Sequence, residues 1–318
     1  MSFLNNMYTV FIQVLILAIM IVVGFCGDKF GYFPEKASRM STNLLFYIVT
    51  PCGIIVSFMK VEFNSKNAVG LLIATGCTVV LHLFGMVYTK FLFNKGDGDK
   101  NAIYKYASMY GNMGYMGLPL SKAVLDAISG NGALGVFYCS AACAVFNIFS
   151  FTHGVSIMSK EKTDKFDFKK LIINPGALGV IIGLPIFLLN IKVPTVIATP
   201  ISSIGSMNTP FAMIMLGTYF AKANLKEAFC QKNIYISALI KLIINPLILI
   251  SLFRLCGLTG NTLIAVSIFV STPTASNTAM FAAKYGRDAS LASQVCGFST
   301  MLSIITMPVC VALAAMIA

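Results

Sequence analysis

The sequence predicts an all-α integral membrane protein with ten transmembrane helices. Of its 318 residues, 57% are hydrophobic and 11% are charged, well below the roughly 25% of charged residues in a soluble domain. The mean hydropathy is +0.83. One crossing of the hydrocarbon core needs about 20 apolar residues. Stretches of at least this length that lack charged residues include 40–59, 67–89, 193–221, 255–283 and 289–318.

Placing a helix over each apolar stretch gives ten segments. Residues 1–7 contain no Lys or Arg, so we interpret the first apolar run as a retained helix and not as a signal peptide. The longest polar loops are 94–101 and 160–170. The expected helices are Tyr8–Cys26, Lys36–Met59, Ala68–Phe93, Ala102–Ile128, Gly132–Ser159, Asn174–Asn190, Val196–Ala221, Asn233–Leu255, Thr262–Lys284 and Ala289–Ile317.

The basic residues give these helices an orientation. Of the 23 Lys and Arg residues, 17 lie on the side of the odd-numbered loops, in the loops or at adjoining helix ends, and five lie on the opposite side, while Lys241 lies within the membrane. Cytoplasmic loops of membrane proteins carry the excess of Lys and Arg. We therefore expect a multi-pass protein of the plasma membrane with both termini outside the cell. The net charge of +12 is explained by this topology, and no nucleic-acid partner is expected.

The two halves of the chain show a weak internal repeat. Pro34 is followed 17 residues later by Pro51, and Pro194 is followed 16 residues later by Pro210. The offset is about 160 residues, half the chain. An odd number of five helices per half inverts one half relative to the other, as in many secondary carriers. The predicted organisation is a first repeat at 1–159, a short cytoplasmic loop at 160–170 and a second repeat at 171–318.

The fourth helix of each half is interrupted near its middle. One interruption is GNMGYMGLP at 111–119, and the other is STPTASNT at 271–278. Proline removes a backbone donor and clashes with the preceding turn, and glycine and hydroxyl residues weaken a helix further. Freed backbone groups are costly in lipid, so such breaks survive only inside protein or beside a cavity. Paired interruptions in two halves predict the substrate site of a carrier.

The polar side chains of these interruptions are the candidate ligand contacts. An Asn amide offers donors to a carboxylate or an acceptor to a cation, and helix N-termini suit an anion. Asn112 and Asn277 are therefore the first candidates. The complete set of expected substrate-binding residues is Asn112, Met113, Gly114, Pro119, Pro273, Thr274, Ser276 and Asn277.

Four stretches resemble the auxin efflux carrier family, also called the PIN-like transporters, within the bile acid/auxin carrier superfamily. They are GNMGYMGLPL at 111–120, INPG at 173–176, KLIINP at 241–246, and TPTASN at 272–277 leading to KYGRD at 284–288. The resemblance spans nearly the whole chain. It implies two inverted five-helix repeats with crossed helices four and nine, a scaffold of helices one, two, six and seven, and a mobile domain that moves by an elevator-like step.

The same resemblance implies a substrate class. Prokaryotic members include malate and malonate permeases, and plant members export indole-3-acetate, so we expect a secondary transporter of a small organic anion. The short loop at 160–170 differs from the long loop of the large plant carriers, so control by loop phosphorylation is not expected. Two alternatives stay open: a membrane sensor or lipid-binding protein that reuses the carrier fold, and a sodium-coupled symporter of the bile-acid type.

Other chemistry has little support in the sequence. No GxxxxGK[ST], HExxH or GxSxG motif occurs, which argues against ATP hydrolysis and against an intramembrane enzyme. The nine Cys residues show no CxxC spacing, so neither a metal site nor a cofactor is expected. The expected partners are the small organic anion and the lipid bilayer. The coupling ion, sodium or proton, and the formation of a homodimer are left open.

Three basic residues inside expected helices have open roles. A Lys in the membrane is costly, and Lys241 is explained by a counter-charge for an anion, by a positive group in place of a bound cation, or by a side chain that reaches the surface or a freed carbonyl. His82 and His153 fit hydrogen-bonded packing residues, and a proton role for His153 is left open.

The orientation is testable by labelling. We expect a single cysteine placed in the 160–170 loop, in a chain without its native cysteines, to resist a membrane-impermeant thiol reagent applied to intact cells. A cysteine placed in the short loop at 61–66 is the matched control and should react. Labelling of the 160–170 position from outside would reverse the topology.

Overall fold

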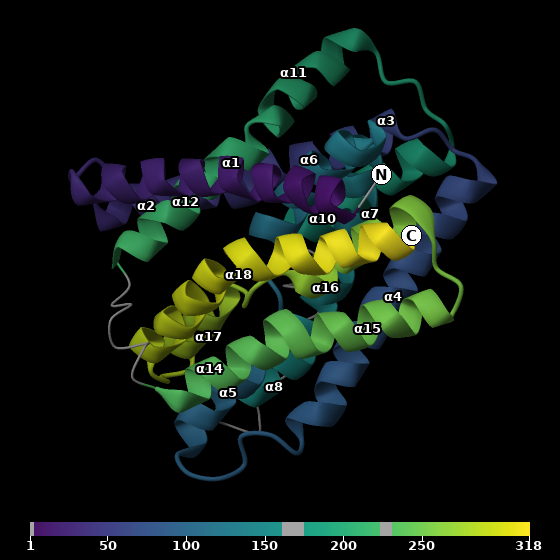
Figure 1. Ribbon diagram of the computed structural model, residues 1–318. Coiled ribbons are helices and arrows are strands. Elements are labelled where there is room, and N and C mark those ends of the chain that lie inside the picture. Colours follow the sequence, from purple (N-terminus) through teal and green to yellow (C-terminus); the bar gives the residue numbers. More distant parts are fainter. Residues whose placement is uncertain (1–2, 161–174, 223–230) are drawn as a thin grey trace.

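A computed structural model describes residues 3–160, 175–222 and 231–318 (Figure 1). Every regular element in these ranges is a helix, which confirms the all-α prediction, and one isolated antiparallel bridge joins Gly111 to Thr274. Within the described residues, five helices are long and apolar enough to cross a membrane, namely Lys36–Lys60, Ser65–Thr89, Gly132–Met158, Lys232–Leu255 and Ala289–Ile317. Two shorter helices in these ranges are also apolar, Leu178–Leu188 and Gly260–Ser271.

Each of the ten expected segments contains helix. The first half holds α1 (Phe3–Lys29), α2 (Glu35–Leu44), α3 (Thr50–Lys60), α4 (Ser65–Thr89), α5 (Gly98–Met109), α6 (Leu118–Ser129), α7 (Gly132–Phe149) and α8 (Val155–Met158). The second half holds α10 (Pro175–Leu188), α11 (Thr195–Ser206), α12 (Asn208–Lys222), α14 (Lys232–Leu239), α15 (Asn245–Leu255), α16 (Gly260–Ser271), α17 (Asn277–Lys284) and α18 (Ala289–Ile317). The predicted helix start at Asn174 and most of the 160–170 loop lie outside the described residues.

One expected helix is divided. We expected a single helix from Val196 to Ala221, and the structure separates α11 from α12 at Met207. Pro210 stands in the first turn of α12, where its missing N–H and rigid ring prevent the turn from continuing the helix before it. The sequence analysis noted this proline only as part of the repeat.

Prolines also coincide with π-helical turns. Turns of this kind lie at Leu45–Val49, Met113–Gly117, Ser150–Gly154 and Ile240–Ile244. Three of the four end two residues before a proline, at Pro51, Pro119 and Pro246. A proline ring clashes with the carbonyl four residues earlier, and a wider turn relieves that clash without ending the helix. The chain from Glu35 to Lys60 therefore runs as one helix through its proline.

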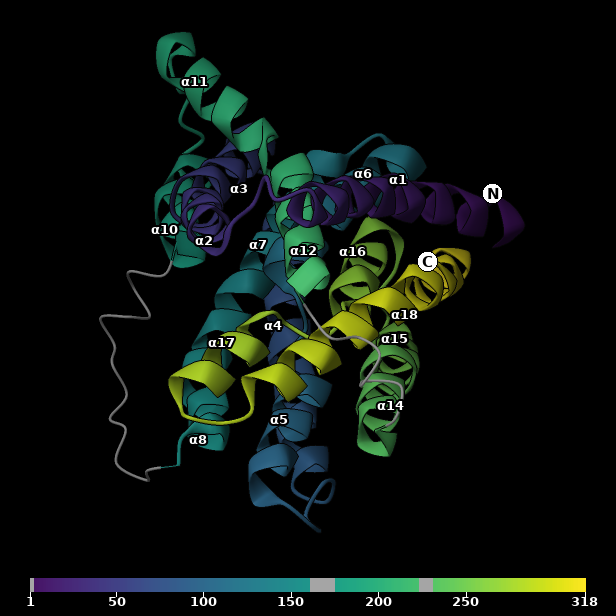
Figure 2. The same ribbon diagram turned by 90° about the vertical axis from the view of Figure 1, so that its left-hand side faces the viewer.

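The helices form two groups (Figure 2). Helices α1, α2, α3, α10, α11 and α12 lie together at one end of the molecule, and α5, α8, α14, α15 and α17 lie at the other. Helices α4, α7, α16 and α18 run between them, where buried apolar side chains form one continuous cluster. Helix α11 projects from the bundle, and none of its residues is buried.

Two glycines set the distance between α1 and α12. A Cβ atom added to Gly24 would lie 2.0 Å from the carbonyl oxygen of Ile214, and one added to Gly217 would lie 2.0 Å from the carbonyl oxygen of Ile21. No side-chain atom can be accommodated at such distances, so the two backbones pack directly against each other. Small residues at helix contacts allow this close packing in membranes.

Arg287 gives the KYGRD segment a structural role. Its guanidinium donates to the carbonyl oxygens of Met158 (2.6 Å), Ile157 (3.2 Å) and Ser159 (3.3 Å) and to Oδ1 of Asp99 (2.8 Å). It therefore caps the C-terminal end of α8 and ties it to the first turn of α5. The neighbouring Asp288 caps α18 by accepting a hydrogen bond from the Leu291 N–H (2.9 Å).

Arg287, Asp99 and Lys160 form a clamp, and Asp99 is its acidic member. Lys160 lies 2.7 Å from its Oδ2 atom. The hydrogen bond from Lys160, together with the positive charges of Lys160 and Arg287, holds the pKa of the Asp99 carboxyl below its ordinary value. A carboxyl with a lowered folded-state pKa stabilises the fold above its unfolded pKa and loses that effect as the pH falls through the folded value. The clamp is therefore intact throughout the neutral range.

The glycine contact predicts a stability effect. We expect Gly24→Ala and Gly217→Ala to lower the melting temperature in detergent, with a loss of about 1–3 kcal/mol each, because the added methyl group overpacks a backbone contact. Gly76→Ala on α4 is the matched control, because a Cβ there meets nothing within 4 Å. Equal melting temperatures of the Gly24 and Gly76 variants would contradict the backbone contact.

The clamp predicts that substitutions of its residues lower the folding stability by an amount that does not depend on pH near neutrality. Arg287→Met should destabilise the protein by about 2–3 kcal/mol, since three partly buried carbonyls lose a charged donor. Asp99→Asn should have a smaller effect that stays constant from pH 5 to pH 8, begins to fall at the ordinary carboxyl pKa of about 4, and disappears only below the lowered pKa of the folded Asp99 carboxyl. Thermal melts at a series of pH values measure both, and a difference that grows on acidification would refute the assigned ion pair.

Candidate functional site

The two interrupted helices meet at their breaks. Helix α5 ends at Met109 and α16 ends at Ser271. Between these ends and the next helical turns, the Asn112 N–H donates to the carbonyl oxygen of Pro273 (2.7 Å), and the Ala275 N–H donates to that of Tyr110 (2.9 Å). Each break thus satisfies backbone groups of the other, which meets the requirement that no backbone group stay unpaired in the membrane.

Gly111 is required at this contact. A Cβ atom on Gly111 would lie 2.3 Å from Oγ1 of Thr272 and 2.9 Å from Nζ of Lys241. The first atom belongs to the opposing segment and the second to a side chain of the helix that contains α14 and α15. Only glycine lets the two segments approach to hydrogen-bonding distance here.

Side chains cap the carbonyl ends of the half-helices. At the end of α5, the Thr274 hydroxyl donates to the carbonyl oxygen of Ala107 (3.0 Å), and Tyr88 Oη (2.7 Å) and Asn245 Nδ2 (3.3 Å) donate to that of Ser108. At the end of α16, the Thr272 hydroxyl donates to the carbonyl oxygen of Phe269 (2.7 Å). The carbonyls of Ala107 and Ser108 near the end of α5, and of Phe269 near the end of α16, are paired in this way.

Lys241 belongs to this group of capping residues. Its Nζ atom donates to the carbonyl oxygen of Val270 (3.4 Å), and its side chain is fully buried. Of the three roles open from the sequence, the third is a side chain that reaches the surface or a freed carbonyl. The buried side chain does not reach the surface, and its contact with a freed carbonyl is present.

The opposite ends of the breaks surround a small central cavity. Asn112 caps the helical run that begins at Met113, and its Oδ1 accepts a hydrogen bond from the Tyr115 N–H (3.3 Å). Asn277 is the first residue of α17. The cavity has a volume of about 40 Å³ and lies against α3 and α7. Its wall includes Thr50, Asn112, Met113, Gly114, Tyr115, Asn147, Ser276 and Asn277.

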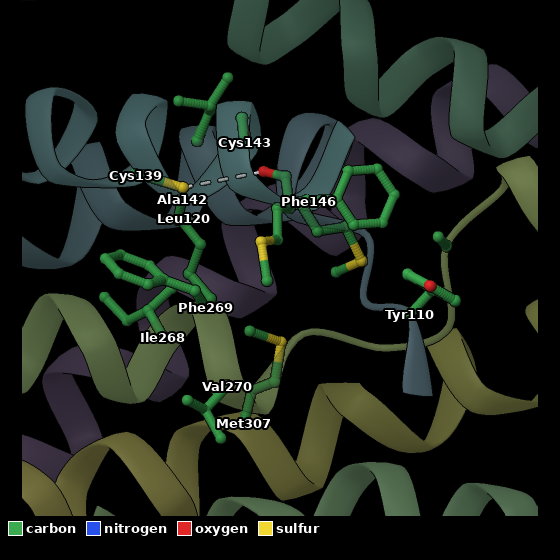
Figure 3. Packing of buried hydrophobic residues seen from close by; sticks show 14 of the residues in the cluster. Tyr110, Leu120, Cys139, Ala142, Cys143, Phe146, Ile268, Phe269, Val270 and Met307 are labelled. Atoms are coloured by element: carbon green, nitrogen blue, oxygen red, sulfur yellow. Dashed lines mark hydrogen bonds between the residues drawn. The ribbon is translucent and has the colours of Figure 1, made fainter. Parts of the chain in front are cut away.

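The crossing is the point at which the breaks at 110–112 and 272–276 meet. It packs against α7 on its apolar side (Figure 3). The Cys139 thiol donates to the carbonyl oxygen of Met113 (3.8 Å), the dashed line in the figure. Cys139, Phe146 and Phe269 belong to one buried cluster around the crossing. Water is therefore excluded from this side of the two breaks.

Two larger cavities lie beyond the central one. The Lys222 cavity (about 330 Å³) is lined by Thr42 and Lys222 and shares Asn112 and Asn277 with the central cavity. The Lys60 cavity (about 440 Å³) is lined by Lys60, Lys122, Asp126, Asn208 and Pro119. Lys60 and Thr42 lie toward opposite ends of the α2–α3 helix, and Asn208 and Lys222 are the two ends of α12. The two cavities therefore lie on opposite sides of the crossing.

The structure places the predicted site residues unequally. Asn112, Met113, Gly114, Ser276 and Asn277 come together around the central cavity. Thr274 lines only the Lys222 cavity, Pro119 lines the Lys60 cavity, and Pro273 contributes its carbonyl to the crossing. These are positions, and the assignment of the residues to substrate binding stays a prediction.

Sequence reasoning missed other cavity residues. Thr50 and Tyr115 line the central cavity, and Lys222 lines the Lys222 cavity. Tyr115 lies inside the GNMGYMGLP stretch but is not among the predicted substrate-binding residues. Thr50 precedes Pro51, which serves in the sequence only as evidence for the internal repeat. Lys222 forms an ion pair with Asp28 (3.2 Å). From the sequence alone, Lys222 is only a topology signal, because no feature of the sequence shows that the end of α12 faces a cavity.

The two histidines lie behind the crossing. Nδ1 of His82 donates to the carbonyl oxygen of Thr78 (2.7 Å), and its ring stacks on Phe149 with a centroid distance of 4.9 Å. Nδ1 of His153 lies 3.1 Å from Oη of Tyr110, which also donates to the carbonyl oxygen of Phe149 (2.9 Å). Hydrogen-bonded packing, the role favoured from the sequence, accounts for both rings.

Comparison with known proteins agrees with this architecture. The model of the family described as membrane transport protein matches residues 9–311. The chain is 22% identical over 294 residues to a Rhizobium meliloti (strain 1021) protein named "Putative malonate transporter", and the match covers 90% of each chain. These similarities and the apolar helices identify a multi-pass membrane transporter. The chain belongs to the membrane transport protein family of auxin efflux and bile acid carriers.

Proposed function

We propose that this transporter is a secondary carrier of a small organic anion, a mono- or dicarboxylate, which binds at the crossing of the two broken helices. The observation that carries the proposal is the meeting of Asn112 and Asn277, from opposite halves of the chain, in the wall of one central cavity. Among the described residues, no charged side chain lines that cavity. Binding there relies on amide donors and helix ends.

The chemistry of these groups suits an anion. The helical run from Met113 and helix α17 both begin at the central cavity, and a helix N-terminus carries a partial positive charge of about half a unit. Backbone N–H groups at such an end bind carboxylates and phosphates. The amides of Asn112 and Asn277 add donors, and Ser276 adds a hydroxyl. In this proposal Pro119, Pro273 and Thr274 shape the backbone, and Met113 and Gly114 complete the wall.

The two larger cavities support alternating access. Each is of the size typical of ligand sites, about 300–1,000 Å³, and they lie on opposite sides of the crossing. An elevator-type movement of the crossing past the group that contains α1 and α12 would open it to each side in turn. Lys122 is paired with Asp126, so Lys60 leaves a net positive charge on one route, which attracts anions, whereas Lys222 on the other route is paired with Asp28.

We also propose that the chain spans the plasma membrane ten times as two inverted repeats, 1–159 and 171–318, joined by the loop 160–170, with both termini outside. Equivalent positions of the two halves support this. Pro34 and Pro194 both stand immediately before a helix, with φ angles of −57° and −56°. The two broken helices occupy the fourth place of each half. The charge bias of the loops supports the orientation.

The first compounds to test follow from the relatives. The name of the Rhizobium meliloti protein suggests malonate, and the family resemblance adds malate and indole-3-acetate. Uptake of each by the purified protein in liposomes, with sodium and pH varied separately, tests the function directly. A protein that moves none of them down an imposed gradient would contradict the proposal.

The site predicts a shared effect of two substitutions. We expect Asn112→Ala and Asn277→Ala each to reduce transport by about tenfold or more, because each removes a hydrogen bond to a charged ligand. The fold should persist, as measured by thermal melting and gel filtration in detergent. Asn112→Asp should abolish transport, since its negative charge repels an anion. The helix cap should persist in this variant, because the carboxylate still accepts a hydrogen bond from the Tyr115 N–H.

The matched control is Asn64→Ala. Asn64 caps α4 by accepting a hydrogen bond from the Asn67 N–H (2.8 Å), as Asn112 caps its own helix, and it lies on the surface away from the cavities. Transport by this variant should equal that of the wild type. Normal transport by both the Asn112 and Asn277 variants would move the substrate away from the crossing.

A further inference from the structure

Lys241 is a buried basic residue that the proposed anion site does not use. It is the tenth residue of the 24-residue helix Lys232–Leu255, and its exposed fraction is 0%. It does not line the central cavity, the Lys222 cavity or the Lys60 cavity. A Lys inside the membrane is costly, so the structure must compensate its charge.

No carboxylate of the described residues provides that compensation. The ion pairs in this part of the chain involve Lys122, Lys160, Lys222 and Arg287 and not Lys241. The seven described acidic residues lie at helix ends or in loops, at positions 28, 35, 62, 97, 99, 126 and 288. The remaining four, at 161, 164, 167 and 227, lie outside the described residues and outside every expected helix.

The partners of Lys241 are helix C-termini. Its Nζ atom lies 3.4 Å from the carbonyl oxygen of Val270, in the last turn of α16, and it would contact any side chain at Gly111, just beyond the end of α5. Each helix C-terminus carries about half a negative charge. Two such ends meet at the crossing and together match one ammonium group.

Asn245 reaches the second of these ends from the same helix. It lies one turn after Lys241, and its Nδ2 donates to the carbonyl oxygen of Ser108 (3.3 Å) in the last turn of α5. Its Oδ1 atom and Oγ of Ser271 are buried without a hydrogen-bond partner among the described residues. The site is thus rich in oxygen acceptors. It is also dry, because Val270 and Met307 belong to the packed apolar cluster (Figure 3).

Freed carbonyls and half-helix C-termini are the groups with which secondary carriers hold coupling cations. We propose that the Lys241 side chain, as an ammonium group, occupies the cation position of this crossing. It neutralises the two C-terminal ends while the substrate anion binds at the N-terminal ends. This inference rests on the proposed function. Its consequence is that anion transport needs no sodium and no co-transported proton.

Liposomes containing the full-length protein test this consequence. We expect wild-type uptake of malonate, malate or indole-3-acetate to be equal in sodium and in choline buffers and not to be driven by an imposed proton gradient. Lys241→Met, which keeps the length of the side chain without its charge, should lose transport by about tenfold or more, because it leaves buried acceptors unpaired. Lys232→Met, at an exposed position of the same helix, is the matched control and should transport normally.

Chemical rescue separates charge from packing. Lys241→Ala leaves room for a small amine, and Lys241→Met does not. Propylammonium should restore transport and raise the melting temperature of the Ala variant, and it should change neither property in the Met variant or the wild type. The melting readout needs no transport, so a wild type that moves none of the three anions would refute the proposed function while this inference is still tested.

Several results would overturn the inference. One is a sodium- or proton-driven wild type. Another is a Lys241→Met variant with the wild-type rate in choline buffer. A third is an Ala variant whose melting temperature does not respond to propylammonium. Equal rescue of the Ala and Met variants would show that the amine acts elsewhere.

Discussion

The pairing of two interrupted backbones at one point underlies the rest of this structure. An interruption in a membrane helix exposes N–H and carbonyl groups that lipid cannot satisfy. Here the Asn112 N–H bonds to Pro273 and the Ala275 N–H bonds to Tyr110. This solution requires both breaks at the same depth and a glycine at position 111. It accounts for the clustering of unusual residues in two stretches about 160 positions apart.

The same contact places the negative C-terminal helix ends of the two breaks on one side and the positive N-terminal helix ends on the other. Both C-terminal ends lie with Lys241 and Asn245, and both following N-terminal ends lie at the central cavity. One small region therefore offers a negative face, which carries its own cation, and a positive face lined by Asn112 and Asn277. The apolar cluster that includes Val270 and Met307 keeps water from the first face, which strengthens the electrostatic effect of each helix end.

Much of the architecture could be predicted because it follows from local rules. Charge-free runs predicted the helices, and Gly and Pro predicted interruptions at 111–119 and 271–278, which overlap the breaks observed at 110–112 and 272–276, although the chain is already helical from Met113. The division of the seventh helix at Met207 was missed, because a proline alone does not distinguish a break at Pro210 from a helix that continues through Pro51 after a π-helical turn. The cavity role of Lys222 was missed for another reason: lining depends on tertiary packing, which a single sequence does not encode locally. The confirmed part is the membrane transporter family, and the ligand contacts remain to be tested.

The buried position of Lys241 has an electrical consequence. An ammonium that stays with the protein returns with the empty carrier, so a complete cycle moves only the charge of the substrate. A membrane potential of 100 mV acts on each moving unit charge with about 2.3 kcal/mol, which corresponds to about a 50-fold concentration ratio. In a cell with a negative interior this force pushes anions outward. A dicarboxylate would feel it twice, so voltage alone sets a direction for a carrier with a fixed internal cation.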